Sequence, residues 1–233
     1  YTTSAWSASG SATYVAHSGQ LVALTPQTIA TGNSPYDIAI SADGTSVYIV
    51  NSQSSTISMY SRNTSTGALT ALATPTISTG LFSKGITISY DGTSVYTASS
   101  NDNTISMYSR NASTGALTAL ATPTISTGSS SKDITISPDG TSVYVACLYN
   151  IYPYSRNTST GALTALTKVS ANNSAAITIS ADGKSVYTAN AYNTVSMYSR
   201  NTSTGALTAL ATPTITTGSS ANDIAISPDG TSA

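Results

Sequence analysis

The sequence is poor in charged residues. Glu is absent, and Asp, Lys and Arg together make up 7% of the 233 residues, against a usual share of about 25%. The formal net charge is −1. A chain without a basic surface cannot attract phosphate backbones or anionic lipids. The sequence therefore predicts no nucleic-acid partner.

Cysteine and histidine are nearly absent as well. Cys147 and His17 are the sole residues of their types. A single cysteine excludes an internal disulfide and any Cys-rich metal site. No apolar run approaches the roughly 18 residues of a membrane span, so we expect no membrane insertion.

Residues with hydroxyl groups or β-branched side chains are abundant instead of charged ones. Ser and Thr form about a third of the chain, beside 15 Tyr, and this composition favours strands over disorder. Low charge with many Ser, Thr, Asn and Tyr indicates an exported protein, extracellular or at the cell surface. The chain begins at Tyr1 without Met or a signal-peptide pattern, which indicates a processed chain or part of a longer one.

An internal repeat of about 47 residues runs through the chain. Three short motifs mark it: an Asp-Gly pair, the tripeptide Ser-Arg-Asn and the tetrapeptide Thr-Gly-Ala-Leu. The Asp-Gly pairs begin at Asp43, Asp91, Asp139, Asp182 and Asp229. The repeat units are approximately 33–80, 81–128, 129–172 and 173–222, with a fifth made of 223–233 together with 1–32.

Each unit predicts four strands. In the first unit they are 37–41, 46–50, 56–62 and about 69–77, because apolar and small polar residues alternate there with the period of a strand. Gly44 supplies the positive φ of a tight hairpin turn. No stretch has the apolar stripe of a helix.

Four-stranded units that cannot bury their apolar faces alone must stack. Radial stacking gives a single all-β domain, a β-propeller of five four-stranded blades. An open β-solenoid is the alternative, although its repeats are usually shorter.

The two ends of the chain complement each other. The tail Thr231-Ser232-Ala233 followed by Tyr1 restores the recurring Thr-Ser-Val-Tyr motif with Ala for Val. We therefore expect a ring closed by N- and C-terminal segments that share one blade, which removes an open sheet edge. The alternative is pairing between molecules, a head-to-tail self-association that makes filaments when its rotation does not close.

The runs 37–51 and 186–190 resemble YVTN-type β-propeller repeats, and the Ser-Arg-Asn-Thr-Ser-Thr-Gly-Ala-Leu segments are similar to the lactonase-like propeller family. The YVTN resemblance implies a microbial surface-layer or other exported protein. The lactonase resemblance implies a sugar-lactone hydrolase. Both families usually have seven blades, so five is a departure.

The residues themselves show no asymmetric cluster of acid, base and metal ligands. The turn aspartates and the arginines that end the third strands (Arg62, Arg110, Arg156, Arg200) recur once per unit, which indicates structural roles. His17 has no partner nearby in sequence, and Cys147 is expected to be an inert thiol. Asp37, Asp133 and Asp223 open three of the five first strands near the axis, where they could suit a cation, but Gly85 and Ala176 interrupt that ring. We therefore predict no catalytic residue, no metal and no cofactor.

The loops that vary between units lie on one face of the disc and are the usual home of binding residues. They carry aromatic side chains beside hydrogen-bonding groups, which suits a protein or carbohydrate partner. The candidate binding residues are Tyr36, Phe82, Lys84, Asp102, Tyr149, Asn150, Tyr192 and Asn193.

Together these features predict a non-enzymatic, exported or cell-surface propeller that acts as a structural or binding module and can self-assemble. A lectin-like binder of carbohydrate is one alternative. A lactonase-like hydrolase is the other, and the residues favour it least.

Overall fold

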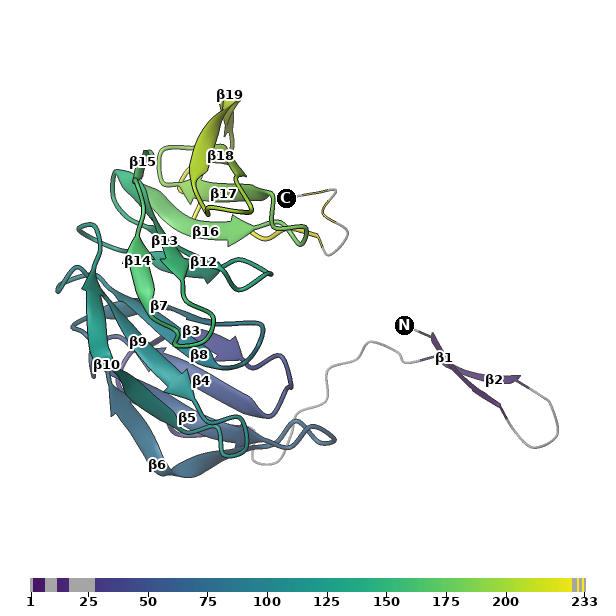
Figure 1. Cartoon of the computed structure of the whole chain (residues 1–233). Helices are drawn as coiled ribbons and strands as arrows, with labels where there is room; N and C mark the ends of the chain where they lie inside the picture. The colour runs from purple at the N-terminus through teal and green to yellow at the C-terminus, as the bar shows by residue number, and fades with distance from the viewer. Residues whose placement is uncertain (1, 7–11, 17–27, 228–229, 231, 233) are drawn as a thin grey trace.

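The computed structural model describes residues 2–6, 12–16, 28–227, 230 and 232, and of the first two segments the backbone alone. The described part is all β, without helix, as predicted. Four four-stranded blades follow one another in an arc, and we number them 1 to 4 in chain order (Figure 1). The described segments include no helix with the length and apolarity needed to cross a membrane.

Blade 1 is an antiparallel meander of β3 (Pro35–Ile40), β4 (Ser46–Asn51), β5 (Thr56–Arg62) and β6 (Leu69–Ser78). These bounds lie within two residues of the predicted ones. Gly44 has φ 68° in the turn between β3 and β4, as expected. The Asp43 carboxylate fixes this turn by accepting hydrogen bonds from the Thr45 amide at 2.9 Å and from the Ser41 hydroxyl.

The other three blades repeat this order. Blade 2 comprises β7 (Ser83–Ile88), β8 (Ser94–Ser99), β9 (Thr104–Arg110) and β10 (Leu117–Ser126). Blade 3 comprises β11 (Asp133–Ile136), β12 (Ser142–Ala146), β13 (Asn150–Arg156) and an interrupted outer strand, β14 (Leu163–Ala165) with β15 (Val169–Ser170). Blade 4 comprises β16 (Ser174–Ile179), β17 (Ser185–Asn190), β18 (Thr194–Arg200) and β19 (Leu207–Thr216).

The described residues of the expected fifth blade do not form a four-stranded sheet. β1 (Thr2–Trp6) and β2 (Ala12–Ala16) pair only with each other and lie apart from the arc (Figure 1). Residues 223–227, expected to be its first strand, form no strand. Tyr1 and Ala233, where the two ends were expected to meet, lie outside the described residues.

The cores lie between blades. One cluster joins Tyr48, Val50 and Met59 of blade 1 to Ile86 and Tyr108 of blade 2. Two more clusters fill the interfaces between blades 2 and 3 and between blades 3 and 4. The stacking predicted from the incomplete apolar faces of single units is therefore present.

A repeated polar contact, which we call the clasp, accompanies each core. In the first clasp Arg110 of blade 2 donates from Nε to the Tyr48 hydroxyl of blade 1 at 3.0 Å and from Nη2 to the Asp43 carboxylate at 3.0 Å. The Tyr48 hydroxyl donates in turn to the Gly115 carbonyl of blade 2 at 2.6 Å. The arginine side chain is buried, so its charge depends on these partners.

The clasp recurs at the next two interfaces. Arg156 pairs with Tyr96 and Asp91, and Arg200 pairs with Tyr144 and Asp139. These arginines and aspartates therefore have the structural role that their repetition predicted. In the first clasp, hydrogen bonds from Ser41 and Thr45, together with one from Arg110, lower the pKa of Asp43.

Candidate functional site

The innermost strand of each blade points its first residues at the axis. β3 lies against β7, β7 against β11, and β11 against β16. Their leading residues, with Asn222 and Asp223 from the C-terminal segment, line one pocket of about 250 Å³. All five repeat units thus contribute to this axial pocket, and its chemistry arises from residues that are far apart in the sequence.

Two carboxylates of the axial pocket bridge neighbouring blades. Asp133 accepts a hydrogen bond from its neighbour Ile134 at 2.7 Å and one from the Ile177 amide of blade 4 at 2.9 Å. Asp37 accepts equivalent bonds from the Ile38 and Ile86 amides. Each carboxylate is therefore held by two elements, which fixes its position beside the pocket.

The charged forms of these two carboxyl groups are unfavourable. Burial raises the pKa of Asp133 to about 7, although two backbone hydrogen bonds oppose the shift, and the nearby charges of Asp37 and Asp223 add to it. Burial also raises the pKa of Asp37. A carboxyl group that titrates near neutrality can exchange a proton at physiological pH, as a general base must.

Two lysines supply positive charge to the same pocket. Burial lowers the pKa of Lys84, and repulsion from Lys132 lowers it further. The Lys84 ammonium also lies 5.8 Å from the ring centroid of Tyr36, within the range of a cation–π contact. No described ion pair joins either lysine to a carboxylate.

Gly85 stands where β7 lies close to the backbone of β11. A Cβ on Gly85 would lie 2.9 Å from the Ile134 backbone nitrogen and 3.0 Å from the Asp133 Cα. Gly85 and Ala176 occupy the places that carry aspartate in the other units. In the described part of the chain no group of three or more Asp, Glu, His or Cys side chains could hold a metal ion.

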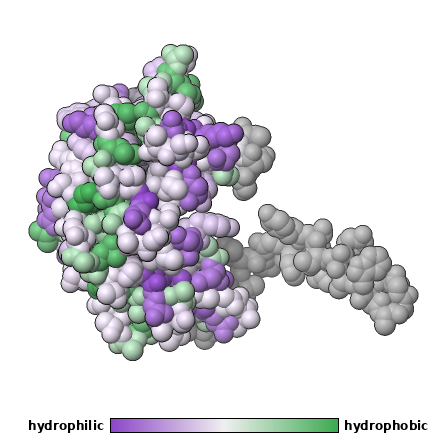
Figure 2. All heavy atoms as spheres, in the orientation of Figure 1, coloured by the Kyte–Doolittle hydropathy of each residue, from purple (hydrophilic) through white to green (hydrophobic). Residues whose placement is uncertain are grey.

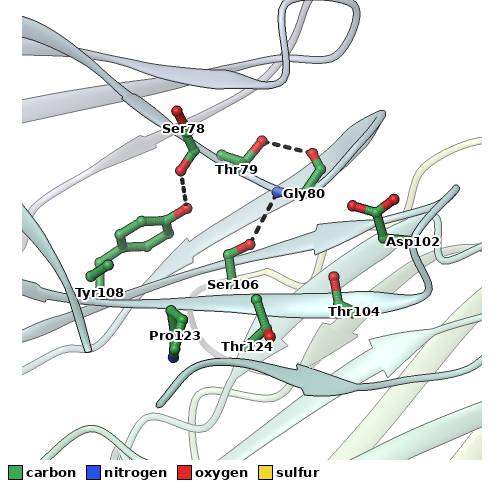
Figure 3. A pocket seen from close by; sticks show the side chains of 10 residues that line it. Ser78, Thr79, Gly80, Asp102, Thr104, Ser106, Tyr108, Pro123 and Thr124 are labelled. Carbon is green, nitrogen blue, oxygen red and sulfur yellow. Dashed lines mark hydrogen bonds between the residues drawn. The ribbon is translucent and has the colours of Figure 1, made fainter. Parts of the chain in front are cut away.

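The structure disperses the eight loop residues singled out in the sequence. Tyr36 and Lys84 meet in the axial pocket. Asp102 lines a different hollow at the rim, of about 380 Å³, between blades 1 and 2 (Figure 3). The other five, Phe82, Tyr149, Asn150, Tyr192 and Asn193, line neither hollow, and a binding role for the set stays a prediction.

The rim hollow is polar, but its groups are already engaged. Figure 3 shows the Tyr108 hydroxyl donating to the Ser78 carbonyl and the Gly80 amide donating to the Ser106 hydroxyl, at 2.7 and 3.2 Å. Asp102 accepts a 2.6 Å bond from the Leu81 amide. These bonds hold a loop in place, so the rim hollow is explained by local structure.

The remaining candidates behave differently from one another. Cys147 is buried, and burial raises the pKa of its thiol to about 11, which is the inert state expected of it. His17 lies outside the described residues. From the sequence, Asp37, Asp133 and Asp223 were considered only as cation ligands. Their combination with Lys84, Lys132 and Asn222 in one pocket was not predicted. The signal available was the position of all six beside the start of a first strand.

Comparisons with known proteins identify the family. The model of the family described as "Lactonase, 7-bladed beta-propeller" matches residues 13–173, more than two thirds of the chain. The chain matches no curated protein. The resemblance to lactonase-like propellers is thus confirmed, whereas the finer resemblance to YVTN-type repeats stays a prediction.

Solved structures share the fold at low sequence identity. A candidate 6-phosphogluconolactonase of Bacteroides uniformis is 20% identical with a TM-score of 0.71; the alignment covers 92% of this chain and 64% of that one. A candidate 6-phosphogluconolactonase of Bacteroides fragilis is 18% identical with a TM-score of 0.72, over 81% and 56%. The periplasmic gluconolactonase of Pseudomonas aeruginosa is 16% identical with a TM-score of 0.70, over 94% and 64%. The chain thus spans less than two thirds of their length.

These findings correct the functional expectation. The interpretation as a non-enzymatic structural or binding module was wrong, because the family model that matches is one of lactonases. The physical reason is that the charged residues of the axial pocket lie in different repeats, and only the stacking of the blades brings them together. The expected five blades also differ from the seven in the family's description. Since the family model matches most of its length, this chain belongs to the lactonase family of seven-bladed β-propellers.

Proposed function

We propose that this chain hydrolyses a sugar lactone in the axial pocket. The observation that carries the proposal is the Asp133 carboxyl group, whose pKa burial raises to about 7 in a pocket that also holds two lysines. Family membership and the lactonases among the solved structures of the same fold support the choice of substrate class.

The proposed reaction begins with water. Ionised Asp133 accepts a proton from a water molecule while the oxygen of that water attacks the lactone carbonyl carbon. The ammonium groups of Lys84 and Lys132 stabilise the oxyanion that develops on the carbonyl oxygen. The ring C–O bond then breaks, and the leaving alkoxide takes up the proton that Asp133 accepted. The product is an open-chain hydroxy acid.

The pocket has further groups that could orient a sugar. The Tyr36 ring offers an apolar face, and Asn222 offers an amide donor and acceptor. Five units around the axis form part of this proposal, because residues from all five repeats line the pocket. Export of the protein stays a prediction from composition.

The test is hydrolysis of δ-gluconolactone and of its 6-phosphate, measured against the spontaneous rate in buffer. We expect Asp133→Asn to reduce kcat at least about a hundredfold, the usual scale for losing a general base. Asp182→Asn is the matched control, because Asp182 lies in the turn between β16 and β17 of blade 4 and not in the pocket. A wild-type rate equal to that of buffer, or full activity in Asp133→Asn, would contradict the proposal.

A further inference from the structure

A second hollow adjoins the axial pocket. It has a volume of about 230 Å³, and we call it the annex. Four of its lining residues also line the axial pocket, so the two hollows share a boundary formed by Tyr36, Lys132, Ala175 and Asn222. The other two, Asn173 and Ala191, line the annex and not the axial pocket. The annex therefore extends the proposed reaction site on the side of blade 4.

The shared boundary has its smallest side chain in blade 4. One residue of each repeat unit stands directly before the position of Asp37, and all five line the axial pocket. These residues are Tyr36, Lys84, Lys132, Ala175 and Asn222. Blade 4 thus has a methyl group where the other units have a ring, an ammonium group or an amide. Because a methyl group fills the least space, the passage between the two hollows is least obstructed at Ala175.

Two side-chain amides of the annex have no partner in the described part of the chain. Neither the Asn173 nor the Asn222 side chain makes a hydrogen bond there. Asn173 is half-buried, so water satisfies its amide only in part. An amide both donates and accepts hydrogen bonds, as a hydroxyl group does. The two amides therefore suit a ligand that carries several hydroxyl groups.

The loop before β16 holds Asn173 in place. The Asn173 carbonyl accepts a hydrogen bond from the Ala191 amide at 3.0 Å, and its φ of 53° lies in the left-handed region that asparagine tolerates. The corresponding residues of the other three blades, Ser34, Phe82 and Ser130, have φ values of 54°, 54° and 53°. The backbone is thus shared by all four blades, whereas the amide side chain is particular to blade 4.

The annex has a single charged group at its boundary. Its lining includes no aspartate, whereas three aspartates line the axial pocket. The charged group is Lys132, which the proposed reaction places at the carbonyl oxygen of the lactone. A lactone bound in this way has its carbonyl group next to the boundary, and the rest of the molecule can extend into the annex.

The Tyr36 ring offers the annex an apolar face. The side chain is 59% exposed and lines both hollows. Lys84, whose ammonium group lies over the same ring, lines the axial pocket alone of the two. An aromatic face beside two amides matches a sugar ring, which has apolar C–H groups on its faces and hydroxyl groups at its edge.

The outer surface of the blades contrasts with the annex. Figure 2 shows apolar side chains scattered there among neutral and hydrophilic ones. The polar groups of the rim hollow are bonded to the loop that they hold, as at the Gly80 and Leu81 amides. The amides of the annex are therefore the more direct indication of a ligand.

We propose that the annex binds a second sugar unit, and that the preferred substrate is the lactone of a disaccharide aldonic acid. The two hollows have similar volumes, about 250 and 230 Å³, so two units of equal size match them. The lactone ring lies in the axial pocket and the second ring in the annex. The glycosidic bond crosses the boundary at Ala175 and stays intact. This inference rests on the proposed function, because the lactone must occupy the axial pocket.

Steady-state kinetics with three lactones test the annex. The substrates are δ-gluconolactone, maltobionolactone and lactobionolactone, of which the last two carry a second sugar in α and β linkage. We expect the wild type to have a KM about tenfold lower for at least one disaccharide lactone than for δ-gluconolactone, because the annex adds binding energy. Equal KM values for all three lactones would overturn the inference.

Asn173→Gly removes the amide without straining the backbone, because glycine adopts a positive φ readily. We expect this variant to raise the KM for the preferred disaccharide lactone about tenfold and to leave kcat and KM for δ-gluconolactone within about twofold. Ser130→Gly is the matched control, since Ser130 has the same φ and lines neither hollow. Equal changes for single-sugar and disaccharide lactones in Asn173→Gly would contradict the annex.

Ala191→Leu fills the annex instead of removing a group from it. The equivalent residue of blade 3 is Leu148, so the fold accommodates leucine at this place. We expect the same selective rise in the KM for the disaccharide lactone. An unchanged KM in this variant would mean that the second sugar does not lie in the annex.

Equilibrium binding separates this inference from the proposed reaction. Gluconate, maltobionate and lactobionate are the stable products of the three lactones, and calorimetry measures their Kd without turnover. We expect the preferred disaccharide acid to bind about tenfold more tightly than gluconate, and Asn173→Gly to remove the difference. If this difference appears while no lactone is hydrolysed faster than in buffer, the proposed reaction is wrong and the annex stands. If lactones are hydrolysed but all three acids bind equally, the annex is overturned and the proposed reaction stands.

Discussion

At the residue scale, the Asp133 carboxyl group links the chemistry of the axial pocket to the stability of the fold. Its pKa of about 7 in the folded state lies above the ordinary aspartate value of 3.8. Between these values the folded chain binds more protons at this site than the unfolded chain. This group's contribution to the free energy of unfolding is therefore complete at acid pH and is lost as pH rises through about 7.

The pH dependence of stability checks this assignment. In urea unfolding between pH 4 and pH 8, we expect the wild type to lose stability relative to Asp133→Asn, by up to about 1.4 kcal/mol per pH unit. The variant also loses one backbone hydrogen bond, so the slope, rather than the absolute value, is the readout. Parallel pH profiles for the two proteins would show that Asp133 titrates normally.

The clasp tyrosines give a second prediction at this scale. Tyr96→Phe removes the acceptor of Arg156 Nε and the donor to the Gly161 carbonyl. We expect a loss of about 1–3 kcal/mol in the free energy of unfolding, because buried partners are left unsatisfied. The matched control is Tyr187→Phe, since the Tyr187 hydroxyl of blade 4 makes no described hydrogen bond. Equal losses of stability in the two variants would show that the clasp hydrogen bonds of Tyr96 do not stabilise the fold.

At the scale of the strand, close packing around the axis depends on Gly85. We expect Gly85→Ala to destabilise the protein by about 1–3 kcal/mol, since the added methyl group meets backbone atoms of β11 that cannot move aside. Gly218→Ala is the control, because a Cβ there has no neighbour within 4 Å. Thermal unfolding of both variants measures the difference, and a neutral Gly85→Ala would mean that the strands separate easily.

The strands themselves were predictable from the sequence. Repeated Asp-Gly and Thr-Gly turns fix the ends of β4 and β5, and alternation fixes their faces, so the bounds agree closely. The site was less accessible. Asp133 and Lys84 lie in different repeats, and only the stacking of blades brings them to one pocket. Burial, which the sequence does not display, then shifts their pKa values.

At the scale of the whole molecule, the arc consists of similar interfaces that share few residues. Tyr48 lies in the first interface and Tyr144 in the third. We expect the losses caused by Tyr48→Phe and Tyr144→Phe to add within about 0.5 kcal/mol, as for independent sites. Chemical denaturation of the single and double variants tests this. A large departure from additivity would mean that strain passes through blades 2 and 3.

The alternation of the innermost strands has a consequence for symmetry. Aspartate stands at equivalent positions of the first, third and fifth units, at Asp37, Asp133 and Asp223, and Gly85 and Ala176 stand there in the second and fourth. Asp37 and Asp223 nevertheless line the same pocket. The charge of Asp223 already adds to the rise in the pKa of Asp37. The side of the axial pocket beside Asp37 and Asp223 would thus be more acidic than the rest. A bound molecule would therefore have a preferred orientation, which identical blades could not impose.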